Sequence, residues 1–296
     1  MSFLNPVSEP VLRFKSTDAG APQINYNARV AGDVKEVLKA CLVTGYGAIV
    51  SAGWTAVNEV ANVIEFVSPS VAMSDYRLGI DDTSTSSTTW YYQYQNARVN
   101  PTNNQPKKVL TYIDKTSINN GWELLVTNRG IYFVEKFFST EVNSILGRTT
   151  YFGQVQSAVS SNVDKNIAFW CAGHGAAYNP YQFFSSGTTH FSVNSYEALI
   201  FASANIEGLR PISKTYANKA VDLISTVYLY KADLFIAGHP ALLFKDPATN
   251  IGLYGVRDEL IGDRPVIYIC LGREVSLANV ETSVRSILLY LDYWEY

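Results

Sequence analysis

The feature that most constrains this chain is a succession of short apolar runs, separated by turn residues, that fills most of the sequence after Gly45. Runs this frequent, with few helical stretches between them to make parallel crossovers, predict antiparallel sheets in a sandwich or barrel-like arrangement. The fold class is therefore mainly β, either all-β or α+β. The clearest hairpin is expected within WELLVTNRGIYFVEKFF, with its turn at Asn128–Gly130. The expected strands are Val63–Val67, Tyr76–Ile80, Trp90–Ala97, Lys108–Ile113, Trp122–Thr127, Thr149–Gln154, Ile167–Ala172, Ser195–Ala202, Val227–Ala237, Pro265–Leu271 and Ser286–Tyr293.

One amphipathic helix is expected before these strands. Asp33, with Glu36 three residues later, has the spacing of an N-terminal capping arrangement, and Gly45 supplies a left-handed stop. A second helical pattern covers Lys214–Ser225. The apolar stripe of the first helix consists of Val34, Val37, Leu38, Cys41 and Leu42.

Residues 1–32 have neither a helical nor a strand period, and their prolines exclude a regular helix. We expect an extended N-terminal arm followed by a β-rich body over residues 33–296, with a subdivision near residues 157–165 as the alternative to a single unit. The arm carries apolar side chains, among them Phe3, Leu4 and Phe14, which are expected to lie along a surface already formed. That surface belongs either to the same subunit or to a neighbouring one, and we favour the neighbour.

The composition excludes several classes of protein. Charged residues make up 17% of the chain, the net charge is −3, and no basic run exceeds Lys107–Lys108, so no nucleic-acid partner is expected. No segment has the length and apolar character of a membrane span, and the N-terminus lacks a signal-peptide pattern. The cysteines Cys41, Cys171 and Cys270 lie far apart in apolar surroundings and are expected as buried, reduced thiols.

Aromatic residues are abundant, with 20 tyrosines and 14 phenylalanines. Two explanations remain open. Aromatic side chains pack well on pleated sheets, and they are also typical of surfaces that become buried against other subunits.

The stretch CLVTGYGAIVSAGWT has the glycines of a phosphate-binding loop but not their spacing. Gly45, Gly47 and Gly53 give G-x-G-x5-G, and the loop follows a helix, whereas a dinucleotide fingerprint needs G-x-G-x-x-G between a strand and a helix. We therefore interpret these three glycines as structural turn residues and expect no cofactor.

No group of residues in the sequence predicts catalysis or a metal site. His174 and His239 lie far apart without a neighbouring ligand motif, and His190 lies in a polar run. Adjacent residues of a strand face opposite ways, so the pair Asp81–Asp82 is expected at a solvated loop start. No catalytic, cofactor-binding or metal-binding residue is expected, and we do not expect an enzyme.

The order of several motifs resembles a family of tailed-bacteriophage virion proteins. The motifs are STDAGAP (16–22), VLKACLVTGYG (37–47), AGWT (52–55), LGIDDT (78–83), ARV (97–99), WELLVTNRGIYF (122–133) and YFGQVQS (151–157). The match covers roughly residues 16–175, and its motifs are turns and strands that indicate kinship and not a reaction. In the last third of the chain the resemblance is weaker and rests on GVRDELIGD (255–263) and the aromatic C-terminal strand.

The resemblance implies a non-enzymatic structural component of a virion, synthesised in the cytoplasm of a bacterial host. Its expected partners are other virion proteins and copies of itself, on the tail or baseplate in preference to capsid decoration. The alternative is a receptor- or carbohydrate-binding module whose exposed aromatic residues stack on a host surface glycan; a cell-wall hydrolase is the third possibility. The candidate contact residues are Phe3, Leu4, Phe14, Trp90, Tyr92 and Tyr94, and Tyr91 belongs to the same aromatic run.

Overall fold

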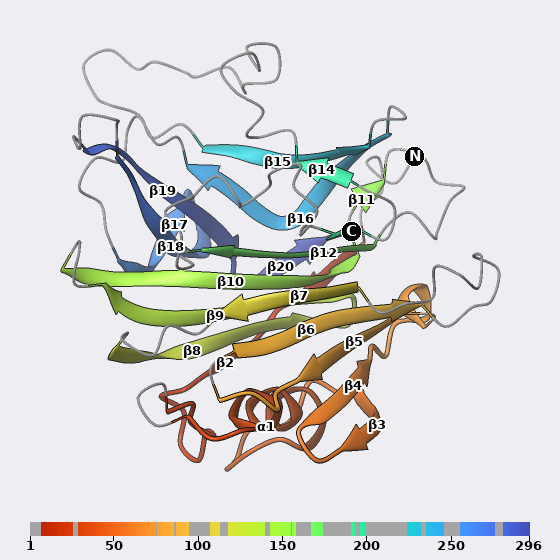
Figure 1. Cartoon of the computed structure of the whole chain (residues 1–296). Helices are drawn as coiled ribbons and strands as arrows, with labels where there is room; N and C mark the ends of the chain where they lie inside the picture. Colours follow the sequence, from red (N-terminus) through yellow and green to blue (C-terminus); the bar gives the residue numbers. More distant parts are fainter. Residues whose placement is uncertain are drawn as a thin grey trace, which may run out of the picture.

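The computed structural model places three antiparallel sheets in layers (Figure 1). A seven-stranded upper sheet, a six-stranded middle sheet and a five-stranded lower sheet follow one another from top to bottom, and the helix lies beside the lower sheet. The structure describes residues 7–25, 29–74, 76–85, 87–94, 107–112, 118–139, 143–154, 156–157, 167–173, 191–192, 196–198, 224–231, 235–245, 255–275 and 281–296.

The helix forms where the apolar stripe predicts it. Helix α1 (Asp33–Lys39) continues directly into a π-helical turn, η2 (Ala40–Thr44), and Gly45 follows with φ of 76°. All five residues of the predicted stripe are buried in the main core. This confirms the expected amphipathic helix near the N-terminus.

The lower sheet has the strand order β3-β4-β5-β6-β7, so consecutive strands are neighbours. A 3₁₀ turn, η3 (Val71–Met73), lies between its second and third strands. The strands are β3 (Thr55–Val60), β4 (Val63–Val67), β5 (Tyr76–Asp81), β6 (Ser87–Tyr94) and β7 (Lys107–Tyr112).

The middle sheet has the order β13-β12-β10-β9-β8-β2, which brings a strand from the N-terminal region to its edge. The predicted hairpin is present: β8 and β9 pair in register across the turn, from Thr127 opposite Gly130 onwards. The strands are β2 (Leu12–Lys15), β8 (Ile118–Thr127), β9 (Gly130–Ser139), β10 (Ser144–Gln154), β12 (Ile167–Gly173) and β13 (Phe191–Ser192).

The upper sheet has the order β14-β15-β16-β19-β18-β17, and β11 (Gln156–Ser157) pairs with β16. A separate two-stranded ribbon joins β1 (Ser8–Pro10) to β20 (Tyr293–Glu295), close to both described ends of the chain. The other strands are β14 (Tyr196–Ala198), β15 (Ile224–Lys231), β16 (Phe235–Lys245), β17 (Val256–Ile261), β18 (Arg264–Val275) and β19 (Glu281–Tyr290).

The main core lies between α1, the inner face of the lower sheet and one face of the middle sheet. Its centre is aromatic: the ring centroids of Trp90 and Phe133 lie 5.5 Å apart, and those of Trp122 and Phe133 lie 6.4 Å apart. A second cluster joins the middle sheet to the upper sheet through Phe137 and Leu146 on one side and Tyr268 on the other. The layers are therefore held together by burial of apolar side chains.

The mainly β, antiparallel fold class is confirmed, although the structure has strands that the sequence pattern does not predict, among them β1, β2, β3 and β17, and places two of the predicted elements differently. The run expected as one strand over Val227–Ala237 is divided between β15 and β16, which pair with each other. Of the second expected helix, Ile224 and Ser225 lie in β15, and the residues before them lie outside the described residues. The polar residues Lys231 and Asp233 interrupt the first run where β15 ends and β16 has yet to begin.

The N-terminal segment corrects the expectation of an arm that binds a neighbouring subunit. Its described part forms β1 and β2, which pair with β20 and β8 of the same chain. Phe14 is 2% exposed and belongs to the main core, so it is not a contact residue for a neighbour. Pro10 is accommodated because it ends an edge strand, where a missing N–H costs little. Phe3 and Leu4 lie outside the described residues.

Candidate functional site

The STDAGAP segment lies directly against the glycine turn that follows the helix. A Cβ atom added to Gly47 would overlap the carbonyl oxygen of Ala19, and one added to Gly20 would lie 3.3 Å from Gly47 Cα. Gly47 also has φ of 54°, a conformation that residues with a side chain rarely adopt. The turn is therefore a site of close backbone packing against the N-terminal segment of the same chain.

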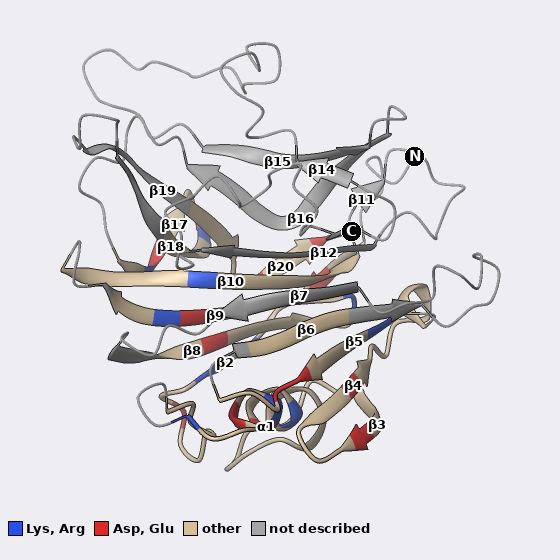
Figure 2. Ribbon diagram, viewed as in Figure 1, with Lys and Arg blue, Asp and Glu red and all other residues tan. Residues whose placement is uncertain are grey.

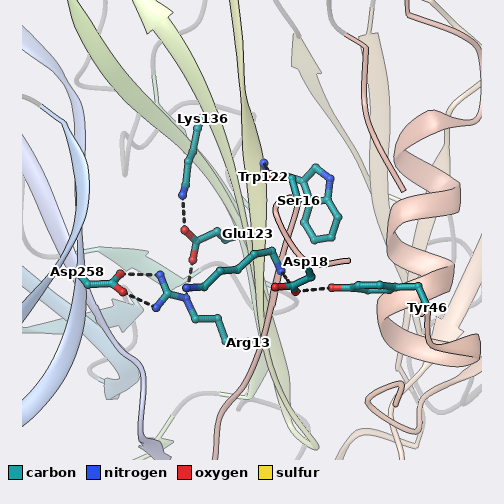
Figure 3. Close-up of polar contacts among 9 residues, drawn as sticks. Arg13, Ser16, Asp18, Tyr46, Trp122, Glu123, Lys136 and Asp258 are labelled. Atoms are coloured by element: carbon teal, nitrogen blue, oxygen red, sulfur yellow. Dashed lines mark hydrogen bonds and ion pairs between the residues drawn. The ribbon is translucent and has the colours of Figure 1, made fainter. Parts of the chain in front are cut away.

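Asp18 fixes this contact through its carboxylate (Figure 3). Its Oδ2 atom accepts hydrogen bonds from the Tyr46 hydroxyl at 2.8 Å and from the Lys15 backbone N–H at 2.8 Å. Burial, reinforced by the hydrogen bond to Asp18, raises the pKa of Tyr46 above its ordinary value. The hydroxyl therefore remains a hydrogen-bond donor, which the carboxylate requires.

Ser16 ties the same segment to the start of the hairpin. The Trp122 backbone N–H donates to Ser16 Oγ at 3.1 Å, and the Ser16 N–H donates to the Trp122 carbonyl at 3.0 Å. The indole N–H of Trp122 donates to the Pro22 carbonyl at 3.0 Å. Because the indole is buried, this bond satisfies a group that would otherwise be costly to remove from water.

The N-terminus of α1 is capped by Asp82, the residue that follows strand β5. The Asp82 Oδ2 atom accepts hydrogen bonds from the backbone N–H groups of Val34 at 2.8 Å and Lys35 at 3.3 Å, and Oδ1 pairs with Arg29 and Thr88. Asp82 is fully buried, so the expectation of a solvated loop start is wrong for this residue. The charge is tolerated because a buried guanidinium and two helix N–H groups face it.

The predicted capping pair does not cap the helix. The N-cap residue is Gly32, with φ of 98° and no side-chain cap. Asp33 instead accepts a hydrogen bond from the Val30 N–H at 3.0 Å, which stabilises the turn before the helix. The carboxylate of Asp82 binds the helix N–H groups, which leaves the local capping box without a role.

A charge network connects the middle sheet to the upper sheet beside this cluster (Figure 3). The Glu123 carboxylate, 3% exposed, accepts from Arg13 Nε at 2.6 Å and also pairs with Lys136. The same Arg13 side chain makes two further hydrogen bonds to Asp258 of β17, Nη1 to Oδ2 at 2.8 Å and Nη2 to Oδ1 at 2.6 Å. These hydrogen bonds lower the pKa of Asp258. Figure 2 shows opposite charges side by side on β8, β9 and β10, which are neighbouring strands of the middle sheet. The hydrogen bonds between Arg13 and Asp258 connect this sheet to the upper sheet.

The aromatic residues proposed for glycan contact are placed differently from what the sequence suggests. Trp90 is 2% exposed and lies in the main core. The ring of Tyr91 covers Gly79, filling the space where a Cβ atom would be, and its hydroxyl donates to Glu65 at 3.4 Å. Tyr92 and Tyr94 belong to β6, but their side chains lie outside the described residues.

Gly53, the third glycine of the predicted turn, has φ of 76° and no atom within 4 Å of an added Cβ. Glycine is therefore favoured at position 53 by the backbone conformation and not by a lack of space. At Gly45 space is also lacking, because an added Cβ atom would lie 2.5 Å from the Ile49 carbonyl oxygen. All three glycines therefore have left-handed backbone geometry.

The described residues contain no group of three or more histidine, cysteine or acidic residues that could hold a metal ion. Cys41 and Cys270 are buried, and burial raises the pKa of the Cys41 thiol well above its usual range. Cys171 and His239 lie in strands, with side chains outside the described residues. His174 and His190 also fall outside them. No helix in the described part of the chain is long and apolar enough to cross a membrane.

Sequence reasoning misses Arg13, Arg29 and Asp82, which carry the polar contacts between elements. The local signal for one of them is the second aspartate of LGIDDT, which follows an apolar strand and is therefore placed at a sheet end. Its partners are far away in the sequence and no spacing rule connects them. In comparisons with known proteins, no family model, no curated protein and no solved structure matches this chain.

Proposed function

We propose that this protein is a non-enzymatic structural component of a tailed-phage particle, which binds other particle proteins and copies of itself. A tail or baseplate position is preferred over capsid decoration. The observation that carries the proposal is that motifs far apart in the sequence contact one another. STDAGAP lies on the turn of CLVTGYG, bonds to the first residue of WELLVTNRGIYF, and lies beside the helix that LGIDDT caps.

These contacts make the motifs of the resemblance parts of one structural unit. Asp18 accepts a hydrogen bond from the Tyr46 hydroxyl, and the absence of a side chain at Gly47 lets the backbone of Ala19 approach. Asp82 caps helix α1, so each of these motif residues has a structural role. Roles of this kind are those of a family defined by a fold and not by a reaction.

The buried charged side chains of the described region favour the same role, because they make contacts within the chain. The carboxylates of Glu123 and Asp82 are buried and paired with cations of the same chain. The glycan-binding alternative loses two of its candidates, because Trp90 and Tyr91 are packed against other side chains. A structural role therefore accounts for the described residues better than either rival.

The proposal is tested on phage particles encoded by the genome that carries this gene. Antibodies against the purified protein are used for immuno-electron microscopy of intact particles, and the particle proteins are identified by mass spectrometry. We expect the chain among the particle proteins, with label at one end of the tail. Antibody pre-absorbed with the purified protein is the control. Absence of the chain from particles, despite its presence in the infected lysate, would overturn the proposal.

A further inference from the structure

The upper sheet ends in an edge strand, β17, that carries exposed side chains on both of its faces. Among the strands that the structure describes, β17 pairs only with β18. Leu260 is 70% exposed, and the side chains of Asp258 and Arg257 are 56% and 38% exposed. An exposed edge of this kind offers its backbone groups to another strand.

The direction of those backbone groups follows from the β17–β18 hairpin. Ile261 lies opposite Arg264 across a two-residue turn, and the Cys270 N–H donates to the Gly255 carbonyl at 2.9 Å. Odd-numbered residues of β17 therefore direct their N–H and C=O groups toward β18. Val256, Asp258 and Leu260 direct theirs away from it, and no described backbone group bonds to them there.

We propose that β17 pairs with β17 of a second copy of this chain, antiparallel and about a two-fold axis at Asp258. The two upper sheets then form one continuous sheet across the dimer. In this register Val256 lies opposite Leu260 of the second copy, and Arg257 lies opposite Glu259. The backbone groups of Val256, Asp258 and Leu260 bond to those of the second copy.

Charge complementarity selects this register. Arg257 Nη2 lies 2.6 Å from Glu259 Oε1 within one chain, so both side chains share a face of the strand. Two-fold symmetry places a second such pair beside the first, with each arginine between two glutamates. A shift of one chain by two residues would instead oppose Glu259 to Glu259 or Arg257 to Arg257, which is unfavourable.

Asp258 lies opposite itself on the two-fold axis, where two unpaired carboxylates would repel each other. Each Asp258 is bound by two guanidinium hydrogen bonds from Arg13 of its own chain, at 2.8 and 2.6 Å. The charge at the axis is therefore compensated before the chains meet. The hydrogen bonds between Arg13 and Asp258, which join two sheets within the chain, therefore also reduce the charge repulsion at this edge.

The contact is short, so the dimer is weak in dilute solution. Within the proposed structural role, a particle would hold neighbouring copies at high effective concentration and make the contact persistent. The pairing itself depends only on the chain. It is therefore tested with purified protein, and its failure would leave the immuno-electron microscopy result unaffected.

The test is sedimentation equilibrium of the purified full-length chain, from micromolar to millimolar concentration. We expect a reversible monomer–dimer equilibrium. Arg257→Glu and Glu259→Arg should each weaken it by about tenfold or more, because each opposes like charges twice. The double variant Arg257→Glu/Glu259→Arg exchanges the charges and should restore dimerisation to near the wild-type level.

Two further variants separate edge pairing from general effects. Lys39→Glu changes the net charge as much as Arg257→Glu does, at the surface pair with Glu59 away from β17, and should leave association unchanged. Leu260→Pro removes only an outward N–H, so it should keep the β17–β18 hairpin and abolish the dimer. Circular dichroism checks that each variant is folded. A wild-type chain that stays monomeric throughout, a dimer that survives Leu260→Pro and both reversals, or a double variant without rescue would overturn the proposal.

Discussion

Asp82 Oδ2 accepts a hydrogen bond from the Val34 backbone N–H at 2.8 Å, across 48 positions of sequence. The end of a strand in the lower sheet thereby caps the helix that packs beside it. The opposite oxygen of the same carboxylate pairs with Arg29, and Thr88 donates to it at 3.1 Å. One buried side chain therefore joins a helix, two strands and the segment before the helix.

Asp82→Ala should lower the free energy of unfolding by about 3 kcal/mol or more, because it leaves a buried guanidinium and helix N–H groups without their acceptor. Urea denaturation measures the change. Asp81→Ala is the matched control: its carboxylate accepts a local hydrogen bond from the Thr83 N–H at 3.2 Å, and its loss should cost about 0.5 kcal/mol. Asp33→Ala should cost about 1 kcal/mol. A larger loss for Asp33→Ala than for Asp82→Ala would show that the local cap dominates.

The contrast between the local contact of Asp33 and the distant contact of Asp82 shows which features of the fold the sequence reveals. The stripe from Val34 to Leu42 predicts the helix because its periodicity is local, and the strand runs are local in the same way. The cap is not local, since it depends on which strand end lies beside the helix. The existence of many of the strands is therefore predictable from the sequence, whereas the ties between elements are not.

Gly47→Ala should lower the melting temperature more than Gly53→Ala. Both glycines have positive φ, which costs alanine about 1 kcal/mol, but only at Gly47 would the new methyl group meet a backbone atom, the Ala19 carbonyl oxygen. Differential scanning calorimetry of the two variants measures the difference. Equal melting temperatures would mean that the N-terminal segment does not lie on the turn.

Glu123→Gln should lower the free energy of unfolding by about 2 kcal/mol, because Arg13 and Lys136 lose the buried carboxylate that both of them bind. Asp258→Asn, at the exposed end of the same network, should cost less than about 1 kcal/mol. Chemical denaturation of both variants provides the comparison. If Asp258→Asn is the more costly change, the network is stabilised mainly at its exposed end.

Alkaline pH should destabilise the protein through its buried tyrosines. Burial, with a contribution from Glu65, raises the pKa of Tyr91 to about 12, and burial also raises the pKa of Tyr151 and Tyr296. In the unfolded chain these groups ionise near 10.0, so above that pH the unfolded chain binds fewer protons than the folded one. The stabilisation is complete below pH 10.0 and is lost as the pH rises toward 12.

Tyrosinate absorbance and circular dichroism, recorded together during an alkaline titration, check this expectation. A fraction of the tyrosines should ionise only as the secondary structure is lost. Tyr91→Phe removes one of these groups and should make the fall in stability with pH shallower. Complete ionisation near pH 10.0 with unchanged circular dichroism would contradict the burial of these side chains.

Aromatic residues give the least reliable functional signal in the sequence. Trp90 lies in a run, WYYQY, that is typical of an exposed stacking surface, yet it packs on Phe133. In a strand the two faces alternate, so a continuous aromatic run always places some rings in the core. The sequence also misleads at Phe14. The residues around Phe14 show no strand period, yet they form the short strand β2, which pairs with β8 in the middle sheet of the same chain.

The motifs behind the resemblance tie the N-terminal segment into its own chain through Ser16, Asp18 and Gly47. Amide hydrogen exchange of the dilute, purified protein tests this attachment without altering a residue. In β2, Arg13 lies opposite Leu125 of the middle sheet, and the Val7 N–H donates to the Tyr296 carbonyl at 2.9 Å. Because the Ser16 N–H donates to the Trp122 carbonyl at 3.0 Å, alternate N–H groups of β2 point toward β8, and peptides covering residues 7–16 should exchange more slowly than the same residues of the unfolded chain. Exchange of residues 7–16 at the rate of the urea-unfolded chain, beside a protected β8, would contradict this attachment.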